Sequence, residues 1–176
     1  MSNAPHRVVV VAHDGGQSLD DAGPIEVFSG AAQLLAHRLG TTHRVGYDVR
    51  VVSTRGGVVP TESGLRFDTD PISSVRGRID SLVVPGGLGV WQQGRDEHFV
   101  ATLRRLVDRS DRLLSVCTGA HLLACTGALD GHTVATHWAR AERISATHPD
   151  VDGDGEPIFL HTPRGDDGPG IGSSAG

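Results

Sequence analysis

The sequence predicts an α/β fold in which a parallel β-sheet carries helices on both faces. Short apolar segments rich in β-branched residues recur along the chain, as at 8–12 and 81–84, and such runs are typical of strands buried on both faces. Segments with apolar residues at helical spacing separate them, and glycine-rich loops follow several of them. This alternation of strands and helices favours a parallel sheet.

The first half of the chain begins with the strand at 8–12 and a polar, glycine-rich loop over 13–23. Pro24 suits the first position of a helix, and Gly40 is expected to end that helix. The apolar stripe of this helix comprises Ile25, Phe28, Ala32, Leu35 and Leu39. Extended segments follow, namely a strand at 47–53 and a short hairpin or pair of edge strands at 56–60 and 65–67.

The second half continues the alternation. Asp96 is expected to cap a helix whose apolar stripe ends at Val107. The other predicted strands lie at 81–84, 112–116, 132–136 and 157–161, and the other predicted helices at 120–126 and 138–146. Apolar periodicity stops after Leu160, so we expect residues 1–161 to form the domain and 162–176 to be a weakly ordered, glycine-rich tail.

The predicted topology also indicates where a ligand would bind. In an open parallel sheet, ligands bind outside the carboxyl ends of the strands. Three unusual segments fall at that edge, at 20–26, 85–89 and 116–119. We therefore expect the functional pocket there.

Composition and charge exclude several classes of function. The net charge of −5 argues against nucleic-acid binding by this chain, because phosphate contacts need clustered cations. The first apolar run spans only five residues, which is too short for a signal peptide or a membrane span. Two cysteines cannot build a disulfide framework and point to a reducing compartment. We expect a cytoplasmic protein with neither a membrane nor a nucleic-acid partner.

Cys117 is the strongest candidate for chemistry. It follows an apolar strand and precedes Thr118, Gly119 and a predicted helix, which is the arrangement of a nucleophile-elbow cysteine. The amino terminus of that helix would favour the thiolate over the thiol. Cys125, in the middle of the helix, is better explained as a small buried apolar residue.

Carboxyl groups from the first helix and its preceding loop compete for the place beside this cysteine. Glu26 interrupts an apolar stretch in the first turn of the predicted helix, where it either hydrogen-bonds the sulfur or caps its own helix. Asp20 and Asp21 lie in the preceding loop, and either residue caps the helix or lines the pocket.

A histidine and backbone groups complete the predicted site. His137 follows a predicted strand and could approach the thiol as a base or an orienting group, although a histidine beside a tryptophan more often serves packing. Backbone N–H groups of the 85–89 turn and of Thr118 could form an oxyanion hole. His121 could pair with Cys117 on a metal, but two further ligands at zinc spacing are missing, so no metal and no cofactor is predicted.

Five motifs occur in order along residues 7–161. They read LDDAGPIEVF at 19–28, VVPGGLG at 83–89, SVCTGA at 115–120, GALDG at 127–131 and ATHW at 135–138. With these motifs the chain resembles the ThiJ/PfpI superfamily, which has a class I glutamine amidotransferase-like fold. Within it, the chain is most similar to the amino-terminal domain of GlxA-type regulators of the AraC/XylS class.

The resemblance implies a three-layer, flavodoxin-like sandwich in which Cys117 is the elbow cysteine and Glu26 the carboxyl beside it. It places His137 in the histidine position of some members. Isonitrile hydratases share the Asp-x-x-Gly-Pro loop, which puts Asp20 in the pocket, and the Cys-Thr-Gly turn. Other relatives are proteases, glyoxalases or deglycases. The implied ligand-binding residues are Gly86, Gly87 and Thr118.

The sequence departs from the family pattern at its carboxyl end. GlxA-type regulators continue into a pair of helix-turn-helix motifs that bind DNA, and this sequence stops before such a region. The family domain closes with a strand, a Ser-Ala-Gly turn and a long apolar helix, whereas residues 173–176 resemble only the start of that turn. We therefore expect an incomplete carboxyl-terminal part, from a truncated chain, with an apolar face left uncovered.

Two functions remain as hypotheses. The first, which the motif sequences favour, is the ligand-sensing domain of an AraC-type regulator without its DNA-binding half, with a small molecule as ligand and a homodimer as a possible assembly. The second is a cysteine-dependent enzyme, such as an isonitrile hydratase or a glyoxalase- or deglycase-like protein, in which Glu26 or Asp20 moves the proton. A third reading, a redox-sensing cysteine, requires a lowered thiol pKa.

Overall fold

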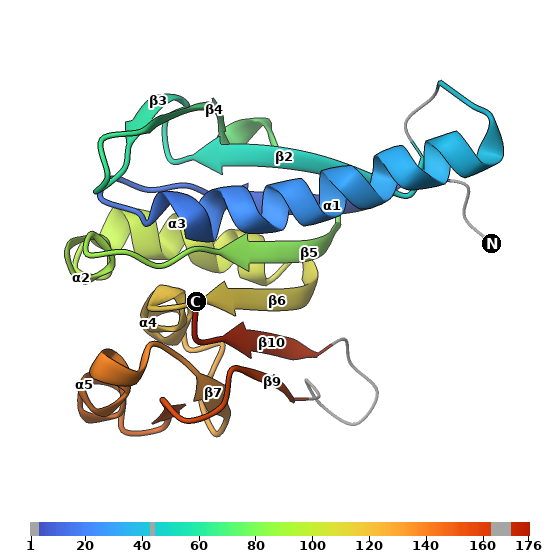
Figure 1. Cartoon of the computed structure of the whole chain (residues 1–176). Coiled ribbons are helices and arrows are strands. Elements are labelled where there is room, and N and C mark those ends of the chain that lie inside the picture. Colours follow the sequence, from blue (N-terminus) through green and yellow to red (C-terminus); the bar gives the residue numbers. More distant parts are fainter. Residues whose placement is uncertain (1–3, 43–44, 163–169) are drawn as a thin grey trace.

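Figure 1 shows the computed structural model of the chain, which describes residues 4–42, 45–162 and 170–176. Its centre is an eight-stranded sheet with the order β3-β4-β2-β1-β5-β6-β10-β9. The strands are β1 (His6–Val11), β2 (Tyr47–Ser53), β3 (Gly57–Pro60), β4 (Arg66–Pro71), β5 (Ile79–Val84), β6 (Ser110–Val116), β7 (Thr133–Ala135), β8 (Asp152–Asp154), β9 (Phe159–Thr162) and β10 (Ile171–Ser174). The helices are α1 (Ser18–Leu39), α2 (Val90–Gln93), α3 (Glu97–Val107), α4 (Gly119–Cys125) and α5 (Ala141–Thr147), with short 3-10 turns η1 (Ile72–Ser74) and η2 (Trp138–Arg140).

The sheet is mostly parallel, as predicted. Every pairing from β4 through β2, β1, β5 and β6 to β10 is parallel, whereas the outer pairings β3–β4 and β10–β9 are antiparallel. The antiparallel β3–β4 pair is the hairpin expected from the sequence. β7 and β8 form a separate two-stranded parallel sheet.

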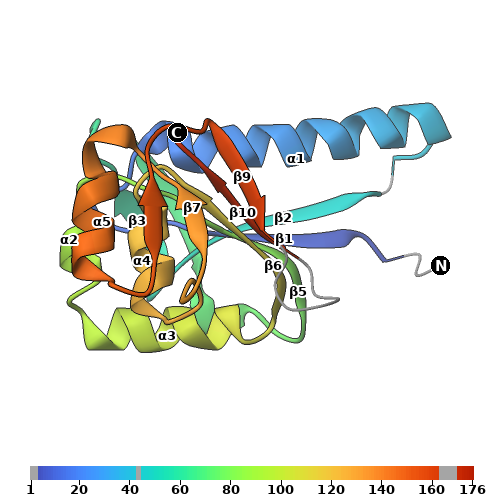
Figure 2. The ribbon, with the colours of Figure 1, turned by 90° about the horizontal axis from the view of Figure 1, so that it is seen from below.

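Helices cover both faces of the sheet and produce three layers. Figure 2 shows α1 on one side of the sheet and α3 on the other. Side chains of β1 alternate between the two apolar cores: Val9 and Val11 belong to the larger core with α3 and α4 residues, and Val8 and Val10 to the smaller core beneath α1. This alternation explains why β1 is apolar at four successive positions, Val8 to Val11, and it confirms the flavodoxin-like three-layer class.

The first helix begins earlier than the sequence predicts. α1 starts at Ser18, so Pro24 lies inside the helix rather than at its first position. A proline there cannot donate to the carbonyl of Asp20. The earlier start places Asp20 and Asp21 in the first turn, where both are buried, and leaves Glu26 exposed in the third turn.

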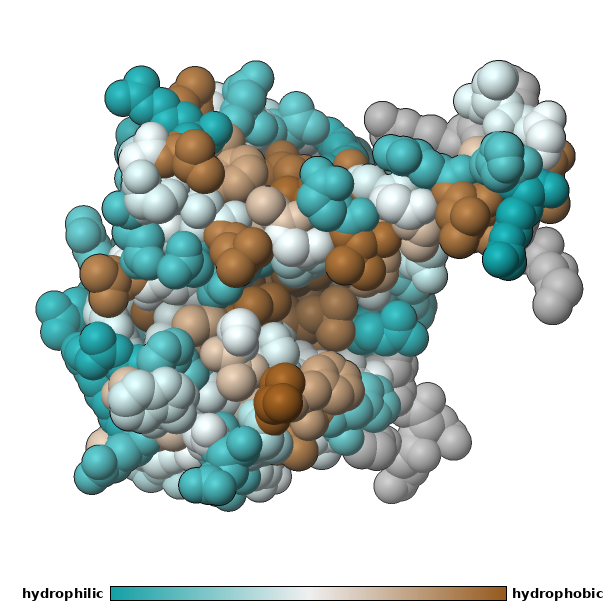
Figure 3. Space-filling model, viewed as in Figure 1, coloured by the Kyte–Doolittle hydropathy of each residue, from teal (hydrophilic) through white to brown (hydrophobic). Residues whose placement is uncertain are grey.

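The carboxyl half of α1 extends beyond the sheet. Gly40 ends the helix as predicted, with a left-handed φ of 61°. Leu35 and Leu39 of the predicted apolar stripe remain 38% and 67% exposed, so this stripe is covered only in its first half. Figure 3 shows apolar surface on this side of the molecule, where Leu114 and Val116 of β6 are only partly buried at the margin of the smaller core.

The prediction of a weakly ordered tail over 162–176 is wrong where the structure describes this segment; residues 163–169 lie outside the described part. Ile171–Ser174 forms β10, which is buried between β6 and β9. A Cβ on Gly172 would lie 2.7 Å from the end of the Leu114 side chain, so a larger residue here would require that side chain to move. Ser173 is buried and its hydroxyl accepts from the N–H of Ala135 at 2.8 Å, which allows a polar residue in the strand.

In the described parts of the chain, no helix has the length and apolar character needed to cross a membrane.

Candidate functional site

Three loops meet at the carboxyl ends of β1, β5 and β6, as the sequence predicts. The N–H of Gln17 donates to the carbonyl of Gly86 at 2.9 Å, and the N–H of Gly86 donates to Oδ2 of Asp20 at 3.2 Å. The N–H of Gly87 donates to Oγ1 of Thr118 at 2.9 Å. The chain runs from β1 to β2 on one side of β1 and later crosses from β4 to β5 on its other side. This edge therefore includes the topological switch point where α/β sheets bind ligands.

Cys117 occupies a sharp turn between β6 and α4. Its φ is 56°, and among the described residues it is the one non-glycine residue with a positive φ. Its N–H donates to the carbonyl of Ser174 at 2.9 Å, and its carbonyl accepts from the hydroxyl of Thr136 at 2.8 Å. A non-glycine residue in this region is strained, and such strain persists only where surrounding contacts hold it. β10 and the segment after β7 therefore hold the turn that presents the cysteine.

Asp20 is the carboxyl group beside the thiol. The Cys117 side chain hydrogen-bonds Asp20, and the N–H of Thr118 also hydrogen-bonds the sulfur. Burial, followed by the negative charge of Asp20, raises the pKa of the Cys117 thiol to about 11. Burial also raises the pKa of Asp20, although the hydrogen bond from the N–H of Gly86 acts to lower it. Burial and the Asp20 charge therefore oppose the effect expected of the helix terminus, which would favour the thiolate.

We expect Asp20→Asn to lower the thiol pKa of Cys117 toward its ordinary range. Asparagine keeps the pocket filled but removes the negative charge that opposes thiolate formation. The measurement is the rate of alkylation by iodoacetamide as a function of pH, in a Cys125→Ser background so that Cys117 is the remaining thiol. Asp68 is exposed, and Asp68→Asn is the matched control, which should leave the dependence of the alkylation rate on pH unchanged. An unchanged or higher midpoint in Asp20→Asn would contradict the role given to the Asp20 charge.

Glu26 does not take the position expected of it. The side chain is exposed on α1, because the helix starts at Ser18 and presents Asp20 to the pocket instead. Neither of the two predicted roles, hydrogen bonding to the sulfur or capping at the third helical position, fits a residue in the third turn of the helix. Of the two carboxyl groups, the structure brings Asp20 to the cysteine.

Asp21 lies behind Asp20 and is almost fully buried. It is 1% exposed, and its Oδ1 has no hydrogen-bond partner in the structure. Burial, with a smaller contribution from the charge of Asp20, raises the pKa of Asp21 to about 7. Two adjacent carboxyl groups with raised pKa values thus lie under the pocket.

The turn after β5 does not offer the free donors that the sequence suggests. The N–H group of Gly86 already donates to Asp20, and that of Gly87 to Thr118. The Thr118 hydroxyl in turn donates a hydrogen bond to the carbonyl of Gly87 at 3.1 Å. A Cβ on Gly86 would lie 2.7 Å from the Thr118 nitrogen, so glycine is needed for this close approach. The glycines therefore position Asp20 and Thr118, and the N–H of Thr118 is the backbone donor that reaches the sulfur.

Cys117 opens into a pocket of about 160 Å³. His137 lines it together with Cys117, so the structure brings these two predicted residues together. Nδ1 of His137 accepts from the N–H of Ala139 at 3.2 Å. The pocket is similar in size to an engineered cavity of about 150 Å³ that binds benzene, so it suits a small ligand. The lining residues not predicted from the sequence are Gln17, Glu62, Leu88, Trp91, Ala139 and Arg140.

A larger hollow of about 660 Å³ lies elsewhere, against η1 and α3. Arg76, Arg105 and Arg109 line it, and neither cysteine does. We place the functional site at the smaller pocket because the strained cysteine, the buried carboxyl groups and the switch point of the sheet coincide there.

Comparison with known families and proteins gives consistent results. The sequence profile of the DJ-1/PfpI family matches residues 6–155. A protein encoded in the cpoL 5′ region of Streptomyces lividans is 34% identical over 149 residues, which cover 85% of this chain and 99% of that protein. Isonitrile hydratase of Pseudomonas putida is 30% identical over 70% of this chain and 48% of its own length. The HTH-type transcriptional regulator GbdR of Pseudomonas aeruginosa is 29% identical over 84% of this chain and 38% of its own length.

Solved structures share the fold. A ThiJ/PfpI family protein from Pseudomonas syringae superposes with a TM-score of 0.79 at 19% identity, covering 99% of this chain and 64% of the other. An AraC family transcriptional regulator from Pseudomonas putida superposes with a TM-score of 0.71 at 18% identity, covering 98% and 84%. At such identities the likeness concerns the fold alone. This chain spans about half or less of the hydratase and of GbdR, but nearly all of the Streptomyces protein.

Proposed function

The chain belongs to the DJ-1/PfpI family, and from this premise we propose that it is a ligand-sensing domain of the kind that AraC-type regulators carry. The observation that carries the proposal is the small pocket of about 160 Å³ that Cys117, Thr118 and His137 line at the carboxyl edge of the sheet. Burial and the Asp20 charge raise the pKa of Cys117 to about 11, which suits a pocket that binds a small molecule without attacking it. The same raised pKa disfavours a redox-sensing cysteine, which needs thiolate near neutral pH.

Similarity to GbdR supports this proposal, since its name describes a transcriptional regulator and the match covers 84% of this chain. The cytoplasmic location and the homodimer expected from the sequence remain predictions. The chain by itself is expected not to bind operator DNA, and a gel-shift assay at two salt concentrations would test this.

Filling the pocket should abolish ligand binding. Ala139 lines the pocket and is exposed, so Ala139→Trp places a large ring at its mouth without burying it in the core. We expect small polar molecules that raise the melting temperature of the wild-type chain to have no effect on Ala139→Trp. Thermal-shift screening followed by calorimetric titration measures this, with Ala101→Trp on the exposed face of α3 as the matched control. Equal responses in both tryptophan variants would place the ligand elsewhere.

A second function is favoured by the contact between Asp20 and Cys117. In a cysteine-dependent hydratase, the sulfur would bond to the electrophilic carbon of an isonitrile while its proton passes through Asp20 to the substrate. Addition of water and cleavage of the carbon–sulfur bond would then release a formamide and restore the thiol. The relative named isonitrile hydratase supports this alternative.

The two functions differ in what happens to the ligand. A sensing domain keeps its ligand unchanged, and Cys117→Ala should still bind it. A hydratase consumes it, and Cys117→Ala and Asp20→Asn should both lose turnover. Product formation by the wild-type chain, followed by mass spectrometry over hours, would therefore reject the sensing proposal. Turnover that survives Cys117→Ala would reject the hydratase.

A further inference from the structure

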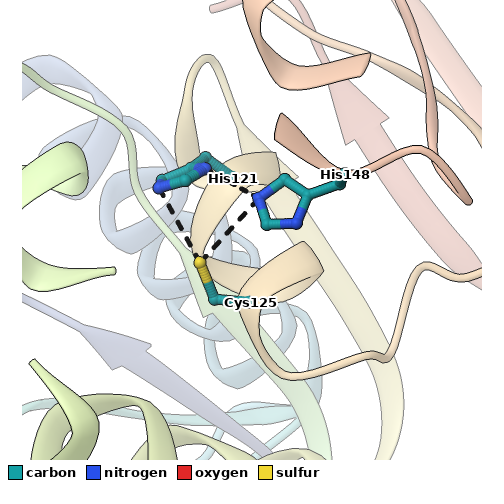
Figure 4. A group of neighbouring side chains, drawn as sticks. All are labelled: His121, Cys125 and His148. Carbon is teal, nitrogen blue, oxygen red and sulfur yellow. Dashed lines mark hydrogen bonds between the residues drawn. The ribbon is translucent and has the colours of Figure 1, made fainter. Parts of the chain in front are cut away.

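Three potential metal ligands meet between α4 and the end of α5. His121 and Cys125 lie four residues apart on α4, which places their side chains on one face of the helix, and His148 caps the end of α5. Figure 4 shows the three side chains pointing toward one another. The sulfur of Cys125 is 3.7 Å from Nε2 of His121 and 3.9 Å from Nε2 of His148, and the latter nitrogen is 3.0 Å from Nδ1 of His121.

We propose that His121, Cys125 and His148 bind a divalent transition-metal ion of the zinc class, with a fourth position open to water. One ligand atom from each residue lies within 4.8 Å of the others. Zinc bonds of about 2.0 Å to nitrogen and about 2.3 Å to sulfur separate tetrahedral ligands by about 3.5 Å. The cluster thus needs only small side-chain rotations to close around an ion. Imidazole and thiolate together are a donor set that zinc prefers over magnesium or calcium.

The surroundings shape the cluster and leave a way in. His121 is 5% exposed, whereas Cys125 and His148 are half-buried, so an ion can enter from their side. A Cβ on Gly94 would lie 2.6 Å from Nε2 of His121 and 3.0 Å from the sulfur, so the Gly94 backbone closes one wall. The Trp91 ring packs on His121 with centroids 4.3 Å apart and also lines the Cys117 pocket. The proposed site is therefore separate from that pocket but shares a wall with it.

Charge around the cluster is compatible with an ion. Arg143 and Arg95 place positive charge near His121, and Asp130 places negative charge near His148. Metal ions bind the neutral form of a histidine ring and the thiolate form of a cysteine. The two arginines oppose an added cation, and the thiolate formed on binding offsets that repulsion.

The experiment uses the full chain, treated with chelator and then titrated with Zn²⁺ against a coloured competing chelator, and separately with Co²⁺ followed by visible absorption. We expect one ion per chain and the absorption of tetrahedral cobalt with a thiolate ligand. Cys125→Ser and His148→Gln should weaken binding by at least about 100-fold. Cys117→Ser, and His37→Gln on the exposed end of α1, are controls that should bind as the wild type does.

Folding of each variant is checked by circular dichroism before titration. A second readout uses the Cys117→Ser chain, in which Cys125 is the remaining thiol, and asks whether Zn²⁺ slows its alkylation at least tenfold. Three results would overturn the proposal: fewer than about 0.2 ions per chain, equal binding by wild type and Cys125→Ser, or loss of binding in Cys117→Ser instead. In the first case the three side chains are only a hydrogen-bonded cluster.

Discussion

Gly119→Ala is expected to destabilise the fold by at least about 3 kcal/mol, because a side chain at this position has no room. A Cβ on Gly119 would overlap the carbonyl oxygen of Val84 and lie 2.9 Å from that of Pro85. These atoms belong to the backbone at the end of β5, so a side-chain rotation cannot relieve the overlap. α4 would have to move away from the sheet, and the Cys117 turn would move with it. Urea unfolding followed by far-ultraviolet circular dichroism measures the change.

Gly30→Ala provides the matched control for this prediction. Gly30 is an exposed residue within α1, and a Cβ there would have no neighbour within 4 Å. Alanine in the exposed interior of a helix should stabilise the protein by up to about 1 kcal/mol. A lower free energy of unfolding for Gly119→Ala and a higher one for Gly30→Ala would show why glycine is needed at position 119. The reason would be the close approach of α4 to the end of β5, and not helix propensity. A Gly119→Ala chain within about 1 kcal/mol of wild type would show that α4 adapts easily.

The sequence predicts the central strands well because burial on both faces leaves a clear pattern. β1 and β5 each end in an apolar run, at 8–11 and 82–84, and the glycine-rich turns that follow mark where the pocket is expected. The strand-to-helix turn at Cys117 was equally clear, since a small-residue segment follows an apolar strand. These features depend on local composition, and local composition is visible in one sequence.

Features that depend on partners distant in the chain were missed. β10 contains glycine and serine and looks like a loop until it pairs with β6 and β9 on both sides. The sequence places the start of α1 too late, because Pro24 suits a first helical position. It therefore predicts Glu26 beside the cysteine, where the structure has Asp20. His148 lies 23 residues beyond Cys125, so its approach to the α4 pair depends on how α5 packs.

The raised thiol pKa was missed for a related reason. An isolated helix terminus lowers a cysteine pKa, but here burial and the Asp20 carboxyl group act in the opposite direction. The strength of burial at Cys117 follows from the tertiary structure, which places β10 and the β5 turn around it. Sequence therefore locates the site, whereas its protonation state follows from the fold.

Asp21→Asn is expected to stabilise the protein at pH 8 by about 2–4 kcal/mol. Burial raises the pKa of Asp21 from its ordinary value of 3.8 to about 7, so the folded chain holds a proton that the unfolded chain releases. The stability that protonated Asp21 contributes to the folded state is therefore fully present below about pH 4 and is lost as the pH rises through 7. Asparagine fills the same space without a charge, so Asp21→Asn avoids this loss of stability. The stabilisation by Asp21→Asn should therefore be largest in alkaline solution.

The dependence on pH distinguishes stabilisation by removal of the Asp21 charge from stabilisation by better packing of the asparagine side chain. Between pH 5 and pH 8, the stability difference between Asp21→Asn and wild type should widen by about 2 kcal/mol, because the wild-type carboxyl group ionises over that range. Urea unfolding at both pH values measures it, with the exposed Asp68→Asn as the control that should show little change. A constant difference would mean that Asp21 does not titrate near 7. A difference that narrows with pH would mean that a partner stabilises its charge, and that the unpaired Oδ1 acquires a cation or donor in solution.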